Sequence, residues 1–369
     1  MPSPSKPLKV ALLGPLPPTI GGIATHMHNL LEGPLGSRVR FVPVETMSRK
    51  HGQAGYERES ILGKVGQILR DAATLIGVLV RCKPDLVHIN SSFNSGAFWR
   101  DALFTLIVRL WRRPVFLQFH GGSLDEFRAL YPAWVWPLIH GVLRRAARIA
   151  VLSQAQAAPL RETDLADRTR IIPNMIDTSA FEESKSDGPF TFLVIASHFT
   201  IEKGVYDVVN AFTQMEEAGR NCRLVLIGSG AEEENLKALC RKHDLEDRVV
   251  FTGFLTKDEV RAWLAKTHVF VLPSHSEGFP MVVMEAMASS LAVVSTRVGA
   301  IPDLIDEGVN GFVVKVGDVA SLADRMATLY LHESLRLDMG QANRTLMHDH
   351  YDVRRVSERF YQLYQEIAG

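Results

Sequence analysis

Short apolar runs alternate along the chain with longer stretches in which apolar residues recur at helical spacing. An apolar run bounded by Gly, Pro or polar residues is typical of a buried strand. In the first half of the chain these runs cover 9–14, 86–90, 114–119, 148–153 and 170–174. In the second half they cover 190–196, 223–228, 248–253, 269–273 and 291–296.

Helical patterns separate these runs and cover 22–31, 61–81, 97–111, 205–217 and 231–243. Apolar strands spaced by helices predict parallel sheets with helices on both faces. The alternation stops at Asn174–Pro189, a polar and turn-rich segment that we interpret as a linker. We therefore predict an α/β protein with two doubly wound, Rossmann-like domains, 1–180 and 190–352.

The composition fits two cytoplasmic domains. A chain of 369 residues with 46% hydrophobic composition can form two cores. Its formal net charge of +0 implies no general attraction to nucleic acid. Cys82, Cys222 and Cys240 lack metal-ligand spacing and suit a reducing compartment. The N-terminus lacks the layout of a signal peptide, and we expect no membrane-spanning segment.

Two loops after predicted strands are suited to bind an anion. Ligands of doubly wound sheets bind outside the carboxyl ends of the strands, so we expect a site in the cleft between the domains. The Pro/Gly loop that begins at Gly14 leads into a helix near Gly22, where backbone N–H groups can approach an anion. A plain strand–helix turn accounts for the same pattern. After 190–196, Lys203 beside Gly204 can reach a phosphate, although most loop lysines are simply solvated.

One residue of the segment 274–290 does not fit its surroundings. Glu285 is the only polar residue between Met281 and Ala288, in a stretch typical of a buried helix. A buried carboxylate without donors costs on the order of several kcal/mol. Two adjacent ribose hydroxyl groups would supply donors, and so would a nearby Arg or Lys.

The loop before this helix offers further ligand contacts. Pro280 suits a first helical turn, so the N–H groups of Gly278 and Phe279 are available at a helix N-terminus. Glu277 lies in the same loop, where the sugar of a bound ligand would lie.

The stretch 228–230, Gly-Ser-Gly, has only half of a dinucleotide-binding fingerprint. The third glycine is missing, and the glutamates 232–234 fill the first helical turn, where they would repel a pyrophosphate. We interpret this stretch as a structural turn. Because no complete G-x-G-x-x-G opens either domain, a nicotinamide oxidoreductase is disfavoured.

Glu277 and Glu285, separated by GFPMVVM, resemble the paired-glutamate signature of the retaining, two-domain (GT-B) glycosyltransferases of family 4. The resemblance extends over nearly the whole chain. PLPPTIGGIATHMHNLL resembles the N-terminal glycine loop of the family, and PDLVHIN and FLQFHGG resemble strands of its first domain. IIPNMID resembles the segment that enters the linker, EKG the diphosphate-binding lysine segment, and VGAIPDLIDEGVNGFVV the block after the glutamates.

This resemblance implies a retaining hexosyltransferase with two domains that face a cleft. A UDP- or GDP-sugar would donate a hexose-type sugar to a glycan or lipid-linked acceptor, as in surface polysaccharide or glycolipid assembly. Residues 190–352 would bind the donor, and a final helix, 353–369, would pack back on the first, acceptor-side domain. Glu285 would bind the ribose diol, and Glu277 would contact hydroxyl groups of the donor sugar.

The resemblance also implies the remaining donor contacts. Lys203 and Gly22 would contact the diphosphate, and the amides of Gly278 and Phe279 would contact its oxygens. His120 would contact the donor sugar, and the loop that contains Gly253 and Phe254 would contact the base. The catalytic set would be His120, Glu277 and Lys203. Protein cations and amides neutralise the diphosphate in this fold, so neither a metal ion nor another cofactor is expected.

Three other histidines remain ambiguous. Family members commonly carry Arg five positions before the lysine, where this chain has His198. A neutral imidazole offers one donor where a guanidinium offers five and a permanent charge. His198 therefore either contacts the diphosphate or packs beneath the loop. His26 and His88 either line the cleft or are hydrogen-bonded core residues.

Two other functions fit the same fold, because a fold does not determine a function. One is a nucleotide-sugar epimerase or hydrolase, which would convert the donor without an acceptor. The other is a non-catalytic nucleotide-sugar-binding module, which donor turnover would exclude.

The first domain also contains a candidate membrane contact. Arginines beside aromatic residues favour binding to an anionic membrane at its inner face. The aromatic and apolar residues concerned are Trp99, Phe104, Leu106 and Trp111 in the arginine-rich stretch 98–113, and Trp134 and Trp136 near Arg144 and Arg145. A core helix at 97–111 would account for part of this pattern.

Overall fold

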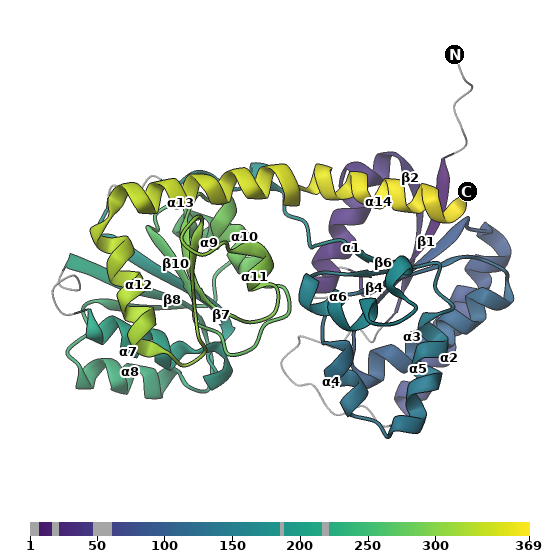
Figure 1. The fold of residues 1–369 in the computed structure, drawn as a ribbon, viewed down its shortest axis with the longest axis horizontal. Helices are drawn as coiled ribbons and strands as arrows, with labels where there is room; N and C mark the ends of the chain where they lie inside the picture. The colour runs from purple at the N-terminus through teal and green to yellow at the C-terminus, as the bar shows by residue number, and fades with distance from the viewer. Residues whose placement is uncertain (1–6, 17–21, 47–60, 185–187, 216–220) are drawn as a thin grey trace, which may run out of the picture. The chain divides into compact units, whose positions relative to one another are not determined.

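The computed structural model describes residues 7–16, 22–46, 61–184, 188–215 and 221–369. The chain folds as two compact units (Figure 1): Met1–Met175 with Val353–Gly369, called unit 1, and Ile176–Asp352, called unit 2. Each unit contains a parallel six-stranded sheet with helices between successive strands. The predicted α/β class with two doubly wound sheets is confirmed.

The sheet of unit 1 has the strand order β2-β1-β3-β4-β5-β6. Its strands are β1 (Leu8–Gly14), β2 (Val39–Glu45), β3 (Leu86–Ser91), β4 (Val115–Phe119), β5 (Arg148–Val151) and β6 (Thr169–Ile171). The pairing register places Leu8 of β1 opposite Val39 of β2, and Val10 of β1 opposite Leu86 of β3.

Helices cover both faces of this sheet. They are α1 (Gly22–Glu32), α2 (Ile61–Cys82), α3 (Ser95–Leu110), α4 (Leu124–Ala129), α5 (Trp136–Leu143), α6 (Gln154–Arg161) and α14 (Val353–Ala368), with 3₁₀ turns η1 (Pro34–Ser37), η2 (Ala133–Val135) and η3 (Ala166–Arg168). Because successive strand residues point to opposite faces, β1 serves both cores. Ala11 and Leu13 pack with α2 to α6, whereas Val10 and Leu12 pack with α1 and α14.

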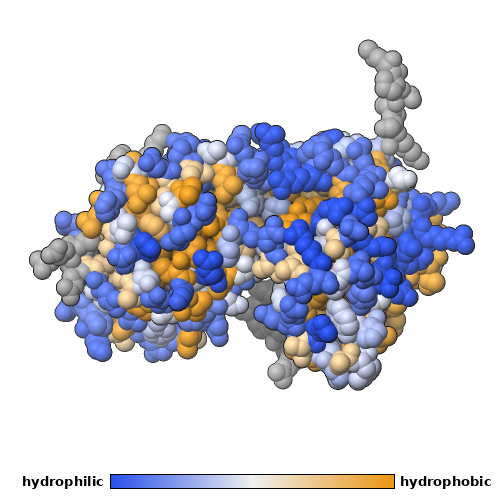
Figure 2. Space-filling view, in the orientation of Figure 1, coloured by the Kyte–Doolittle hydropathy of each residue, from blue (hydrophilic) through white to orange (hydrophobic). Residues whose placement is uncertain are grey.

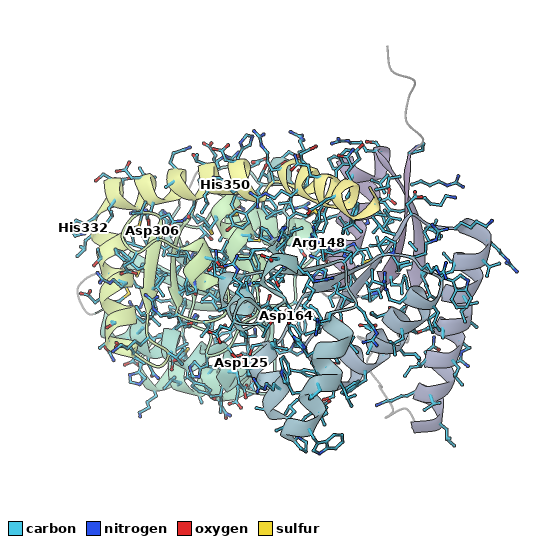
Figure 3. The ribbon with its side chains drawn as sticks, turned by 45° about the vertical axis from the view of Figure 1, so that its right-hand side comes forward. Asp125, Arg148, Asp164, Asp306, His332 and His350 are labelled. Atoms are coloured by element: carbon cyan, nitrogen blue, oxygen red, sulfur yellow. The ribbon has the colours of Figure 1, made fainter. Side chains whose placement is uncertain are left out.

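The C-terminal helix α14 is held on unit 1 by apolar and ionic contacts. Phe360 and Tyr364 are fully buried in the core around β1. Arg148 on β5, labelled in Figure 3, forms an ion pair with Glu366. Hydrophilic residues cover the outer side of α14 in Figure 2. The helix is thus amphipathic and contributes a side of the unit 1 core.

The sheet of unit 2 has the strand order β12-β11-β10-β7-β8-β9. Its strands are β7 (Phe190–His198), β8 (Cys222–Ser229), β9 (Val249–Gly253), β10 (Val269–Leu272), β11 (Ala292–Thr296) and β12 (Gly311–Val314). Its helices are α7 (Val205–Gln214), α8 (Glu233–Lys242), α9 (Lys257–Leu264), α10 (Met281–Ala288), α11 (Ile301–Leu304), α12 (Val319–Leu331) and α13 (Glu333–Leu346), with short turns η4 (Thr178–Ala180), η5 (Ile201–Lys203) and the π-helical η7 (Met347–Tyr351).

Two edge strands were not predicted from the sequence. β2 contains Pro43 and the exposed Arg40, and it tolerates them because it has a neighbour on one side only. β12, which spans only Gly311–Val314, is an edge strand of the unit 2 sheet. Each apolar run that was predicted as a strand overlaps a strand of the structure. In the run 170–174, the strand β6 ends at Ile171, before Pro173.

The expected linker Asn174–Pro189 packs largely on unit 2. The N–H of Ile176 donates to the carbonyl of Tyr351 at 3.0 Å, and the Thr178 hydroxyl donates to the Asp352 carboxylate at 2.6 Å. Residues 185–187 lie outside the described residues, as do 216 and 217 of the expected helix 205–217. Nowhere in the described ranges does a helix reach the length and apolarity needed to cross a membrane.

Candidate functional site

The loops that follow β7 and β10 meet at the topological switch point of unit 2. β7 and β10 are neighbours in the middle of the sheet, but the chain continues from them towards opposite edges. In doubly wound sheets, ligands bind in the crevice that this reversal leaves at the carboxyl ends of the strands. The β7 loop carries Lys203 and the β10 loop carries Glu277, so the topology brings both predicted residues to the expected place.

Backbone contacts lock these two loops together. Gly204 has φ +63, and a Cβ atom there would lie 1.9 Å from the carbonyl oxygen of Pro273. Only glycine therefore allows the β7 loop to lie so close to the β10 loop. The N–H of His275 donates to the carbonyl of Glu202 at 2.7 Å.

Lys203 and Glu277 form an ion pair across the two loops. The Lys203 Nζ lies 2.7 Å from Glu277 Oε1, and the side chains are 33% and 13% exposed. Beside them, the His275 Nε2–H donates to the Asp207 carboxylate at 2.7 Å. This His–Asp contact was not predicted, and it further fixes the β10 loop on the first turn of α7.

The N-terminus of α10 has backbone amides available for an anion. Pro280 occupies the cap position, and no side chain caps the helix. The preceding loop is held from behind, because Gly278 O accepts from the N–H of Ala300 at 2.9 Å. A Cβ at Gly299 would lie 2.3 Å from Glu277 O. A fixed loop with uncapped N–H groups is suited to hold phosphate oxygens.

Glu285 is a half-buried carboxylate that has no partner among the described residues. The structure gives its carboxylate no hydrogen bond or ion pair among the described residues, although Ser289 bonds to its backbone carbonyl. Burial raises the pKa of Glu285 to about 7, while the charges of Lys257 and Arg261 lower it. Within the described part of the chain, the salt bridge considered as an alternative is therefore not formed, and the carboxylate retains its capacity to accept hydrogen bonds.

His198 and Phe254 lie side by side at the carboxyl edge of the same sheet. His198 ends β7 and is exposed, and its ring centroid lies 6.4 Å from that of Phe254. Phe254 is 68% exposed and follows Gly253, which has φ +71. The aromatic surface predicted for the base is thus open to solvent and adjacent to His198.

In unit 1, Gly22 is the exposed first residue of α1, after the carboxyl end of β1. Residues 17–21 of the predicted glycine loop lie outside the described residues. A Cβ atom at Gly22 would meet nothing within 4 Å among the described residues.

His120 follows β4 and is held in one orientation by Asn90. The Asn90 amide donates to Leu13 O at 3.0 Å, so its oxygen faces His120 and accepts from the Nε2–H at 2.7 Å. Burial, with the neighbouring His26 and His88, holds the pKa of His120 well below its usual range. His120 is therefore neutral at physiological pH, and its Nδ1 is an acceptor.

His26 and His88 are core residues. His26 bonds to Gln118 at 3.1 Å, and its ring centroid lies 4.5 Å from that of His120 with the two rings tilted by 60°. Burial lowers the pKa of His26 to about 4. His88 is fully buried and shares a 2.7 Å hydrogen bond with the Tyr364 hydroxyl of α14. Of the two alternatives, a hydrogen-bonded core residue is the correct one for both histidines.

The Gly-Ser-Gly stretch 228–230, at the carboxyl end of β8, is structural. A Cβ at Gly228 would lie 1.7 Å from Ala196 O, so glycine is needed for packing. Glu233 accepts from the Ser229 hydroxyl at 2.7 Å and pairs with Lys237 at 2.9 Å. The glutamates thus stabilise the start of α8, as expected from the helix dipole.

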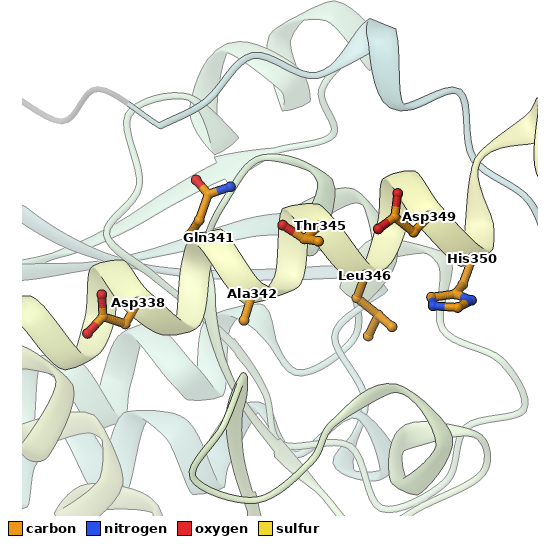
Figure 4. Close-up of a pocket in the computed structure, with 7 residues that line it drawn as sticks. All are labelled: Asp338, Gln341, Ala342, Thr345, Leu346, Asp349 and His350. Atoms are coloured by element: carbon orange, nitrogen blue, oxygen red, sulfur yellow. The ribbon is translucent and has the colours of Figure 1, made fainter.

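Other features of the described residues contain no predicted site residue. A surface pocket of about 470 Å³ runs along α13 and η7, where Figure 4 shows Asp338, Thr345 and His350 on the helix. In the described part of the chain, no group of three or more His, Cys, Asp or Glu side chains is placed to hold a metal ion.

Two family models match the chain. Residues 20–180 match the model described as glycosyltransferase family 4, and residues 176–346 match the model described as glycosyl transferases group 1. Together they cover the chain from 20 to 346.

Curated relatives match parts of the chain. N-acetyl-alpha-D-glucosaminyl L-malate synthase from Bacillus anthracis is 32% identical over 175 residues, which are 47% of this chain and 45% of the relative. The amylovoran biosynthesis glycosyltransferase AmsK from Erwinia amylovora is 34% identical over 161 residues, 42% of this chain and 37% of the relative. The chain thus spans less than half of the length of either relative.

Solved structures match the fold over nearly the whole chain. A structure of Anabaena Alr3699/HepE in complex with UDP has a TM-score of 0.75 at 17% identity and covers 97% of this chain and 100% of its own. The two parallel sheets described above are those of a GT-B glycosyltransferase. From the family matches and the fold, the chain belongs to the group 1 glycosyl transferases of glycosyltransferase family 4 and has the GT-B fold.

Proposed function

We propose that the protein transfers a hexose-type sugar from a UDP- or GDP-sugar to a glycan or lipid-linked acceptor, with retention of anomeric configuration. It would act in the cytoplasm in the assembly of surface polysaccharides or glycolipids. The observation that carries the proposal is Glu285, a half-buried carboxylate without a partner among the described residues. A ribose diol would supply the two donors that it lacks.

Two relatives support this choice of substrates. AmsK is named for amylovoran biosynthesis, and HepE has been solved in complex with UDP. The chemistry of the unit 2 loops fits the same class of donor, because Lys203 and the α10 N-terminus favour a diphosphate and Phe254 offers a face to a base.

The arrangement would act by stabilising the leaving group. As the bond from the anomeric carbon to the diphosphate oxygen breaks, negative charge develops beside Lys203 and the amides of Gly278 and Phe279. The acceptor hydroxyl oxygen forms the new bond to the anomeric carbon, and its proton leaves with the diphosphate. Glu277, now paired with Lys203, would turn its carboxylate to hydroxyl groups of the donor sugar.

We assign His120 the role of an acceptor. Its low pKa keeps the imidazole neutral, and Asn90 occupies the Nε2–H, so Nδ1 can accept a hydrogen bond from a hydroxyl group of the donor sugar. A proton-donating role for His120 would require an imidazolium that this environment disfavours.

We propose that His198 contacts the diphosphate of the bound nucleotide sugar. The His198 ring neighbours Phe254 and is exposed, so it is available to a ligand. His198→Arg would supply the permanent charge and the five N–H groups of a guanidinium, and it should tighten binding of the nucleotide sugar. Equal donor affinities of wild type, His198→Arg and His198→Ala would instead make His198 a packing residue.

A thermal-shift panel tests the proposed donor. UDP- and GDP-hexoses are compared with NADH and ATP, and saturation at 100 times Kd should stabilise the protein by about 2.7 kcal/mol. We expect a shift with at least one nucleotide sugar and none with NADH. If only the non-sugar nucleotides stabilise the protein, the donor assignment fails.

Retention and metal independence are tested on the product. Because protein cations and amides are proposed to carry the diphosphate charge, transfer should continue in EDTA. NMR of the anomeric signal should show the configuration of the donor. Loss of transfer that Mg²⁺ restores would contradict the first proposal, and an inverted product would contradict the second.

A further inference from the structure

The helical layer α2 to α5 of unit 1 has hydrophobic side chains on its solvent side. Among the described residues of unit 1, every large hydrophobic side chain that is exposed lies between Leu62 and Leu138. The opposite helical layer, α1 and α14, has no exposed large hydrophobic side chain in the described ranges. This asymmetry marks one face of the unit, because scattered single exposed residues would appear on both layers.

Helix α3 has an apolar stripe on each side. Leu103, Leu106 and Leu110 are 38%, 41% and 78% exposed, and their spacing of three and four residues places them on one helix face. Phe104 lies on the inner side and is fully buried. The two interpretations of the stretch 98–113 each hold for part of it: Phe104 is core, whereas Leu106 and Trp111 are surface.

Helix α5 and the turn before it extend the same surface. α3 contacts α5, and the indole N–H of Trp99 donates to the Tyr131 hydroxyl at 2.9 Å. Trp134 and Leu138 are 72% and 55% exposed. Trp136 is half-buried under the Arg128 guanidinium, which lies 4.7 Å from the ring centroid. Aromatic and aliphatic side chains thus continue from α3 to α5.

The charge of this layer is positive. Residues 61–145 contain 11 Lys and Arg against 5 Asp and Glu, a net charge of +6 in a chain whose total is +0. Of the acidic residues, Asp71 and Asp101 are buried. Arg144 pairs with Asp164, labelled in Figure 3, but Arg109, Arg112 and Arg145 form no ion pair with an acidic side chain of the described residues.

We propose that this α3–α5 face docks on the surface of an anionic lipid bilayer. The face consists of Leu103, Leu106, Leu110, Trp111, Trp134 and Leu138, with Arg109, Arg112 and Arg145. An anionic bilayer presents phosphate groups directly above hydrocarbon, which matches exposed Leu and Trp side chains beside exposed arginines that have no acidic partner among the described residues. α3 would lie parallel to the surface, with its Leu stripe inserted at headgroup depth.

Vesicle co-sedimentation of the full chain, without donor, tests the proposal. We expect binding to vesicles of phosphatidylcholine with 30% phosphatidylglycerol, weaker binding to pure phosphatidylcholine, and a decrease with salt. Each basic residue contributes about fivefold to such binding, so Arg109→Gln with Arg112→Gln should lower the partition coefficient about 25-fold. Leu106→Gln with Leu110→Gln should lower it at least tenfold.

Matched variants on unit 2 are the controls. Leu331→Gln with Leu337→Gln removes side chains that are 67% and 59% exposed, and Arg241→Gln with Lys242→Gln removes two exposed charges of α8. Both should bind vesicles as wild type does. Melting curves verify folding, and Trp134→Ser replaces the α3 double variant if that variant does not fold.

Two results would overturn the proposal. Equal binding to charged and uncharged vesicles, unaffected by the arginine variants, would remove the electrostatic basis. Light scattering that shows a dimer, dispersed by Leu106→Gln with Leu110→Gln and without affinity for vesicles, would make the face an interface between copies of the chain.

Discussion

Replacing Glu285 by glutamine is expected to stabilise the ligand-free protein and to weaken donor binding. The two effects have one cause. Without a ligand, the carboxylate is half-buried and lacks donors among the described residues, so its ionised form is unfavourable. With a bound nucleotide sugar, the ribose hydroxyl groups would donate to the same oxygens. Glutamine keeps the shape but has no charge and only one acceptor oxygen.

The size of the stabilisation follows from the pKa of Glu285, which burial raises from 4.5 to about 7. The folded state binds this proton more tightly than the unfolded state, so stability falls as the pH rises from about 4.5 to about 7 and then remains constant. At 1.36 kcal/mol per pKa unit, the cost at pH 8 is about 3 kcal/mol, and at pH 5 it is less than about 1 kcal/mol. Glu285→Gln removes this cost.

Calorimetric melting of wild type and Glu285→Gln at pH 5 and pH 8 measures the effect. At about 2–4 °C per kcal/mol, the unfolding midpoint of unit 2 should rise by about 6–12 °C at pH 8 and little at pH 5. Donor affinity should fall by roughly 1.5–3 kcal/mol. Glu234→Gln, which removes an 81% exposed carboxylate, is the control for both quantities. A midpoint difference that is the same at both pH values would refute the reasoning, as would unchanged donor affinity.

Three further predictions concern the other residues. Lys203→Met should weaken donor binding by roughly 1.5–3 kcal/mol in a calorimetric titration, whereas Lys237→Met should not, and equal affinities of the two variants would exclude Lys203 from the donor site. Gly204→Ala should lower the melting temperature and the donor affinity together, because its Cβ would meet Pro273 O at 1.9 Å, whereas Gly188→Ala, whose Cβ would meet no described residue within 4 Å, should behave as wild type. Unit 1 should lose stability as the pH falls below about 6.5, because imidazoles of the unfolded chain take up protons that the buried histidines exclude. With a folded-state pKa of about 4, His26 alone should lower the free energy of unfolding by about 2 kcal/mol at pH 5. His26→Gln should remove this loss.

The order of strands and helices was accessible from the sequence because strands buried on both faces are apolar throughout. Val10 to Leu13 and Phe270 to Leu272 are examples, each fully or almost fully buried. β2 escaped prediction because an edge strand is partly solvated, and its Arg40 and Pro43 interrupt the apolar pattern. Local pattern therefore identifies central strands better than edges.

The donor loops could be predicted as motifs, but their contacts could not. Lys203 and Glu277 are 74 residues apart, and only the adjacency of β7 and β10 brings them together. The contacts of His275 with Asp207 and of His120 with Asn90 depend on the same kind of non-local pairing. Their sequence signal is weak, because polar residues in or after apolar runs also occur where they serve only packing and hydrogen bonding in the core.

Sugar transfer from a nucleotide sugar bound at the unit 2 site can be measured directly. The most direct measurement incubates the protein with each UDP- or GDP-hexose and a glycolipid and glycan extract, and follows release of the nucleoside diphosphate. We expect acceptor-dependent release from at least one donor, strongly reduced in Glu285→Gln and Lys203→Met and normal in Glu234→Gln. Donor consumption that needs no acceptor and yields an epimerised or free sugar would contradict it, as would release that both site variants retain.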